Sequence, residues 1–327
     1  MTAIELPELD PNEQIPTSFE DLLPVSSDPV KTAIRGKLVY ILNSQGEILP
    51  PANSPLGKLW RLVNSPQSSV QECEEVIELD PALASRIFRV ANSAAYGATA
   101  NNISDAIFRI GFTCVREQAF NAGVFTQFSG LNLPPEWDLF WLRNIFVARL
   151  CEKMAAKYSS TDGSEYLAGL IHDMGWLFLA TYFPKEFTAI FTGGKPVREA
   201  EKEFLPFGHA DITGAIATRS LLPLRAVNAI LHHHDPMTSA IEASIKPDQI
   251  EPAKNPRFLA VILNLGDQIA DCCQMNMFGE TTRTIEEIQQ SPEGFWLNHF
   301  GAPIDLRALA EEELVKSQEI FDVFFAR

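Results

Sequence analysis

The sequence has no long apolar run and no run of basic residues. Its uninterrupted apolar stretches stay below the ~18 residues that a membrane-spanning helix needs, so no membrane contact is expected. Aspartate and glutamate number 42 against 26 lysines and arginines, which gives a formal net charge of -16. That balance argues against a broad phosphate-binding surface, so nucleic acid is not expected as a partner.

Cysteine is scarce as well. The five cysteines are odd in number, and their spacings match no zinc knuckle. Cys272 and Cys273 are neighbours, which makes a disulfide between them geometrically unfavourable. We therefore expect buried thiols in a reducing compartment. Residues 1–7 also lack the basic-then-apolar order of a signal peptide, and a cytoplasmic location is the expectation.

The sequence does contain abundant core-forming residues and repeated helix signals. At 327 residues, 46% of them hydrophobic, the chain is long enough for one large domain or two ordinary ones. From Leu49 onward, capping residues precede apolar residues spaced three and four apart, as at Asp80-Pro81. Strand patterns are almost absent there. The predicted class is all-α, a multi-helix bundle, with helices expected at about 137–156, 164–183, 196–205, 209–221, 224–233, 256–272, 284–289, 292–300 and 306–325.

Residues 1–48 differ from the remainder, because they are acidic and punctuated by proline. They are predicted to form an extension, either an arm lying on the main body or a flexible leader. The segment Lys37–Leu42, followed by a polar turn, predicts a short β-hairpin near residues 37–49, although a helix beginning near Pro29 is the alternative. Helix breakers at Gly130, Pro134 and Pro135 divide the rest, residues 49–327, into a helical lobe of about 49–130 and a second lobe of about 131–327.

One polar pair stands inside an apolar segment. His172 and Asp173 occur within Ala168-Gly-Leu-Ile-His-Asp-Met-Gly175, and burying unpaired polar groups is costly. The pair therefore either satisfies itself by hydrogen bonds or holds a metal ion. Adjacent residues of a helix point about 100° apart, so further ligands must come from other segments.

The remaining candidates are histidines and one later aspartate. His209 stands at the start of a predicted helix, where it has a purely structural alternative. His233 and His234 belong to a triplet at a helix end, where histidines also interact favourably with the helix dipole. Asp267 lies in an apolar run and needs a partner, for which His172 is the expected choice.

Taken together and in order, these motifs resemble the HDOD family, a divergent branch of the HD phosphohydrolase superfamily. The resemblance spans roughly residues 49–327. Its motifs are Asp80-Pro-Ala-Leu83, Ala91-Asn-Ser-Ala94, Ile103-Ser-x-Ala106-Ile107 ending in Gly111, the His-Asp segment, Gly208-His209 with Gly214, His233-His234-x-Pro236, and Asp267. The resemblance implies an all-helical fold and a role in bacterial signalling rather than turnover.

The resemblance also implies a metal site and identifies two departures from it. The residues in matching positions are His172, Asp173, Asp267, His209, His233 and His234, which would hold a divalent ion such as Fe, Mn, Mg, Zn or Ni. The histidine that catalytic relatives take from an earlier helix aligns with Asn144, a weak neutral ligand. Relatives with the GYP extension commonly have a lysine where this chain has Trp176. The site is therefore predicted to be degenerate, with Asn144 replacing a ligand.

Two functions follow from this pattern. The first is a non-catalytic signal-transduction module that acts by binding signalling protein partners and requires no cofactor. The alternative is a metal-dependent phosphohydrolase acting on a nucleotide or cyclic dinucleotide. A small-ligand sensor that uses the same pocket lies between them. The sequence does not specify the partner, the signal or the oligomeric state.

Overall fold

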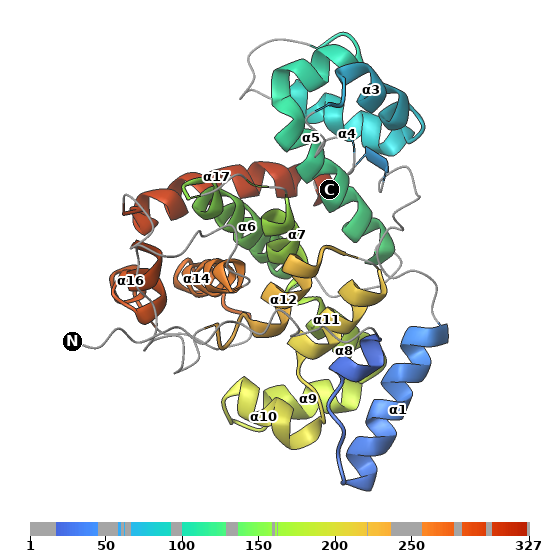
Figure 1. Cartoon of the computed structure of the whole chain (residues 1–327), viewed down its shortest axis with the longest axis vertical. Coiled ribbons are helices and arrows are strands. Elements are labelled where there is room, and N and C mark those ends of the chain that lie inside the picture. Colours follow the sequence, from blue (N-terminus) through green and yellow to red (C-terminus); the bar gives the residue numbers. More distant parts are fainter. Residues whose placement is uncertain are drawn as a thin grey trace, which may run out of the picture. The chain divides into compact units, whose positions relative to one another are not determined.

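The computed structural model describes residues 18–44, 58–59, 62, 67–92, 100–128, 137–158, 161, 163–220, 222–236, 257–277, 283–298 and 303–325. Every regular element in these ranges is a helix (Figure 1). The predicted all-α class is therefore confirmed. Within the same ranges, each helix is too short or too polar to cross a membrane.

The chain divides into two compact units. Unit 1 contains Met1–Gly46 and Phe146–Glu313, and unit 2 contains Glu47–Ile145 and Leu314–Arg327. Two helices, α6 (Trp137–Ala156) and α17 (Leu306–Phe325), contribute residues to both units. The extension and the two lobes expected from the sequence stay predictions of domain organisation.

Unit 2 is built on the helix starts that the sequence indicates. Its helices include α3 (Val70–Glu78), α4 (Pro81–Ala91) and α5 (Ile103–Phe128). Ser69 and Glu72 form a capping box at the start of α3. The Asp80 carboxylate accepts hydrogen bonds from the first turn of α4. Gly111, with φ of 76° and ψ of 162°, interrupts the helical conformation within α5, at the position where the sequence predicts a helix end.

Unit 1 carries the remaining helices and the candidate site residues on α7 to α14. These elements are η1 (Phe19–Leu22), α1 (Pro29–Ser44), α7 (Ser164–Ile171), α8 (Met174–Tyr182), α9 (Pro184–Thr192), α10 (Val197–Phe204), α11 (His209–Arg219), α12 (Leu224–His232), α14 (Phe258–Cys272), α15 (Ile285–Gln289) and α16 (Pro292–Asn298). Most begin within two residues of the predicted start. The site therefore lies on elements that the sequence pattern largely indicates.

The predicted hairpin near residues 37–49 is wrong where the structure describes it. Residues 37–44 belong to α1, which begins at Pro29, as the alternative prediction has it. The buried residues of this helix are Leu38, Ile41 and Leu42, spaced three and four apart, so a helix buries all three on one face. Residues 45–49 lie outside the described ranges.

The N-terminal segment, residues 18–44, packs against the rest of unit 1. Leu23, Leu38 and Leu42 are buried. The Nζ atom of Lys31 donates a hydrogen bond to the Lys202 carbonyl oxygen at 2.6 Å. The Nζ atom of Lys37 donates a hydrogen bond to the Tyr182 carbonyl oxygen at 2.6 Å, which places α1 beside the end of α8 (Figure 1). Residues 18–44 therefore contact the other helices of unit 1 directly.

Close packing of α7 depends on Gly169. A Cβ atom added there would lie 2.5 Å from the Cα of Ala148 on α6, and backbone atoms cannot move aside cheaply. His172 follows Gly169 by one turn, so the same contact sets the position of the site. The helices can approach this closely only because residue 169 has no side chain.

We expect Gly169→Ala to lower the free energy of unfolding by about 1–3 kcal/mol, the usual cost of overpacking. Chemical denaturation of the full chain measures this loss. Gly36→Ala is the matched control, because a Cβ atom at Gly36, in the middle of α1, meets nothing within 4 Å. That variant should gain about 0.5–1 kcal/mol through helix propensity. Equal effects at the two glycines would contradict the packing argument.

Candidate metal centre

His172 and Asp173 lie in a break between two helices. The sequence predicts one helix over 164–183, but α7 ends at Ile171 and α8 begins at Met174. Asp173 leaves the helical conformation, with φ of -95° and ψ of 5°. The break lets neighbouring side chains converge, and His172 Nε2 lies 3.2 Å from Asp173 Oδ2. The expectation that adjacent residues point apart holds only for an unbroken helix.

Asp267 completes the contacts of His172. It is supplied by α14, which is buried along nearly its whole length. His172 Nε2 lies 3.0 Å from Asp267 Oδ1, so the predicted partner is the one found. The other ring nitrogen, Nδ1, lies 2.8 Å from the Gly169 carbonyl oxygen. Since a carbonyl only accepts, Nδ1 carries a proton and donates it.

His209 reaches the same place from the start of α11. Its Nε2 lies 3.4 Å from Asp173 Oδ1. Its Nδ1 lies 2.9 Å from Glu201 Oε1 on α10, which also accepts the His209 backbone N–H at 2.7 Å. Glu201 therefore fixes the ring with Nδ1 as the donor and Nε2 turned toward Asp173.

Gly175 is what allows α8 and α11 to meet at this point. A Cβ atom at Gly175 would lie 2.1 Å from the carbonyl oxygen of His209. The Gly175 N–H donates to the Thr213 hydroxyl at 2.8 Å, and that hydroxyl donates to the His209 carbonyl at 3.0 Å. The first turns of the two helices are thus joined directly beside the His-Asp pair.

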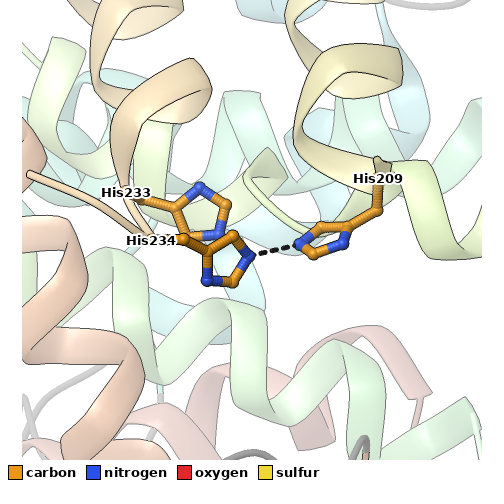
Figure 2. Close-up of side chains that lie close together, drawn as sticks. All are labelled: His209, His233 and His234. Atoms are coloured by element: carbon orange, nitrogen blue, oxygen red, sulfur yellow. Dashed lines mark hydrogen bonds between the residues drawn. The ribbon is translucent and has the colours of Figure 1, made fainter. Parts of the chain in front are cut away.

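His233 and His234 follow the last residue of α12. His233 Nδ1 lies 2.6 Å from the Ile230 carbonyl oxygen and donates to it. The His233 carbonyl in turn accepts from Asn264 Nδ2 at 2.8 Å, which ties this turn to α14. Figure 2 shows the His234 ring directed at His209, with 2.7 Å between their Nε2 atoms.

These contacts define one group, called here the His/Asp cluster: His172, Asp173, His209, His233, His234 and Asp267. Two trios within it have ligand atoms that all lie within 4.8 Å of one another, one being His209, His233 and His234. The other is His172, His233 and Asp267. The structure therefore brings together all six residues that the sequence nominates as ligands.

Asn144 is the remaining nominated residue. It lies on α6, where its side chain is fully buried. Within the described part of the chain, its amide nitrogen and oxygen have no hydrogen-bond partner. That Asn144 replaces a ligand of the cluster stays a prediction.

Opposite charges dominate the environment of His172. Burial by itself lowers the pKa of His172, but Asp173 and Asp267 outweigh it and raise that pKa to about 10. Burial likewise raises the pKa of Asp173, but His172 beside it brings the value to about 2. Positive charge on this side of the cluster is thus strongly favoured, whether a proton or a metal cation supplies it.

His233 has the opposite electrostatic character. Burial lowers its pKa to about 4, and neighbouring His172 adds to the effect. The ring is therefore neutral, with Nδ1 donating to Ile230 and a lone pair on Nε2. That Nε2 atom is buried and has no hydrogen-bond partner among the described residues. A buried nitrogen lone pair between two trios of ligand atoms is well suited to a metal ion.

Sequence reasoning missed Glu201, which orients His209. Its helix, α10, has the sequence of a charged surface helix, but Glu201 is only 4% exposed. A signal was present, because Glu201 shares the buried stripe of Val197 and Ala200 at helical spacing. A carboxylate on an apolar stripe indicates a buried partner.

Comparisons with known proteins identify a family and related folds. The sequence profile of the HDOD domain matches residues 49–236. An uncharacterised protein of Treponema pallidum (strain Nichols) is 24% identical over 215 residues, or 61% of this chain. The chain spans about 40% of the length of that relative.

Three solved structures share the fold. An HDOD domain protein of unknown function from Geobacter sulfurreducens has a TM-score of 0.69 at 20% identity, covering 89% of this chain and 98% of its own. A Shewanella amazonensis SB2B protein, assigned as a phosphohydrolase, has a TM-score of 0.60 at 24% identity, and the match covers 88% of this chain and 97% of that protein. A Marinobacter aquaeolei VT8 protein, assigned to signal transduction, has a TM-score of 0.62 at 20% identity, and the match covers 94% of this chain and 67% of that protein. At these identities the likeness establishes the fold.

We expect Asp267→Ala to destabilise the chain in buffer that contains a chelator. Removing one partner of a buried ion pair typically costs ~3–5 kcal/mol, because the other partner is left uncompensated. Chemical denaturation measures the loss. Asp267→Asn is the control, since it keeps an oxygen acceptor for His172 and should lose less. If Asp267→Ala is as stable as the parent, His172 and Asp267 do not form a stabilising pair.

Proposed function

Because the chain belongs to the HDOD family, we propose that it is a signal-transduction module that binds a divalent cation at the His/Asp cluster. In this proposal the cation is held without turnover, and the module acts by binding a protein partner. The likeness to the Marinobacter aquaeolei protein assigned to signal transduction supports the signalling role. The partner itself is not identified.

One observation carries the cation site. Three imidazoles use Nδ1 to donate to fixed acceptors, the Gly169 carbonyl, the Glu201 carboxylate and the Ile230 carbonyl. Their Nε2 atoms, those of His172, His209 and His233, are turned into the cluster. Metal-binding histidines are usually oriented in this way by a second hydrogen bond, which fixes the tautomer and the ring. A structural cluster of histidines has no need of this shared orientation.

The donor set indicates which cations fit. Four imidazoles and two carboxylates favour a transition metal such as iron, zinc or nickel over magnesium, which prefers oxygen ligands. His172, Asp173 and Asp267 would hold the cation on one side, and His209, His233 and His234 on the other. A bound divalent cation would polarise an oxygen atom of a ligand that reaches it.

The absence of turnover is inferred from Trp176. Its ring stacks on His209 with 4.4 Å between ring centroids. It is also almost fully buried among Phe187 and Phe191 of α9. This is the position at which the resemblance implies a lysine in catalytic relatives. An apolar ring there supplies no positive charge to offset the negative charge that develops on a phosphoryl group during hydrolysis.

A phosphohydrolase is the second candidate. The observation that favours it is a pocket of about 430 Å³ that includes His209 and His234 in its lining. A ligand could therefore approach the cluster from this side. The Shewanella amazonensis relative is assigned as a phosphohydrolase, which gives the candidate independent support.

The cation site is tested by elemental analysis of the full chain purified without chelator or nickel resin. We expect a divalent transition metal in near-stoichiometric amount. His233→Ala should weaken its binding by more than about tenfold, the smallest loss typical of disturbing even a supporting contact. His232→Ala is the matched control, because His232 is the exposed neighbour and belongs to neither trio. Metal content that is the same in both variants would contradict the proposed site.

Turnover is tested separately. With Mn²⁺ or Mg²⁺ supplied, we expect no appreciable hydrolysis of phosphomonoesters, phosphodiesters or cyclic dinucleotides, because Trp176 stands where a cation would be needed. Phosphate release and nucleotide chromatography measure this. Hydrolysis that disappears in Asp173→Ala would favour the phosphohydrolase instead.

A further inference from the structure

The pocket beside His209 and His234 lies entirely within unit 1. Its walls come from the N-terminal segment, from α10, from the start of α11 and from the end of α12. Its volume of about 430 Å³ is within the usual range for small-molecule sites. Its lining contains the charged residues Lys31, Arg198, Glu201, Lys202, Asp211 and Asp235.

The pocket meets the His/Asp cluster on one side. His234 is half-buried, and His209 is buried but still contributes to the lining. His172 and His233, by contrast, are 0% exposed and do not line the pocket. A ligand in the pocket would therefore approach a bound cation past His209 and His234.

Three cationic side chains surround this approach: Lys31, Arg198 and Lys202. The acidic side chains of the lining are already engaged. Glu201 accepts from His209, and Asp211 accepts from the Gly208 N–H at 2.8 Å. Asp235 lies 2.6 Å from Arg198, so these two charges offset each other and Lys31 and Lys202 are the lining's cations that have no ion pair among the described residues.

Lys31 connects the pocket to the N-terminal segment. Its Nζ donates to the Lys202 carbonyl oxygen, and an ammonium group has three protons, so two remain for a ligand. Pro24, Val25 and Ser26 of the same segment complete that wall. All these residues precede residue 49, where the match to the HDOD profile begins. The wall is thus built by a part of the chain that lies outside the family match.

We infer that this pocket binds a small phosphate-bearing ligand, with Lys31 of the N-terminal segment as one of its binding residues. The anionic group lies among Lys31, Arg198 and Lys202 and extends toward the cation at His209 and His234. The inference rests on the proposed cation site. It also gives the N-terminal segment a role, because ligand binding would tie that segment to α10 and α12.

The test is calorimetric titration of the metal-loaded full chain with inorganic phosphate and with adenosine monophosphate as probes. We expect both to bind. Lys31→Met should weaken phosphate binding about tenfold, the factor that corresponds to ~1.4 kcal/mol, on the order of one charge-assisted hydrogen bond. Binding of phosphate alone would restrict the site to the anion itself, and would still support the inference if Lys31→Met weakens it.

Lys37→Met is the matched control. Lys37 is on the same helix and donates to a backbone carbonyl at the same 2.6 Å, but it does not line the pocket. Each variant loses one positive charge and one lysine–carbonyl hydrogen bond. Phosphate binding should be unchanged in Lys37→Met, and metal content should be unchanged in both.

The outcomes separate the two proposals. A parent chain that holds no metal would overturn the proposed function and this inference with it. A metal-loaded parent that binds neither probe would overturn this inference alone. Equal weakening of phosphate binding in Lys31→Met and Lys37→Met would also overturn this inference. The loss would then come from altered packing of the N-terminal segment rather than from a lost contact with the ligand.

Discussion

The buried contact of His172 with Asp173 and Asp267 is the constraint around which unit 1 is arranged. An imidazole that is 0% exposed and two nearly buried carboxylates are costly to remove from water unless each is compensated. Compensation requires α14 to lie with Asp267 3.0 Å from His172, and α7 to present His172 at its C-terminal end. A proton or a metal cation satisfies the same contact, so the fold is compatible with either.

Helix ends supply nearly all the ligand atoms of the cluster. His172 and Asp173 lie between α7 and α8, His209 is the first residue of α11, and His233 and His234 follow α12. Side chains at helix ends are not confined to one face, so five residues from three places can converge. Only Asp267 comes from within a helix. Gly175 then permits the backbone approach, because any Cβ atom there would meet the His209 carbonyl.

The same region supports the proposal of a cation site that holds its ion without turnover. Trp176 stacks on the His209 ring, and the Glu201 carboxylate accepts a hydrogen bond from Nδ1 of the same ring. These contacts stabilise the cluster and orient it, but the tryptophan contributes no charge for a phosphoryl group. Lys31, Arg198 and Lys202, on α1 and α10, line the adjoining pocket instead. In the two proposals, the ligand and the cation would therefore bind side by side.

The sequence by itself determined the helical class and most helix boundaries, whereas the six residues of the His/Asp cluster were nominated with the help of the resemblance to the HDOD family. These follow from local features: caps such as Asp80, apolar spacing, and polar residues inside apolar runs such as Asp267. Tertiary structure alone decided the break at His172 and Asp173, the helical state of Lys37–Leu42, and the burial of Glu201. Each depends on what packs against the residue rather than on its neighbours in sequence. The approach of α8 to α11, the pocket and its Lys31 wall arise from contacts between distant segments, which a local pattern does not encode.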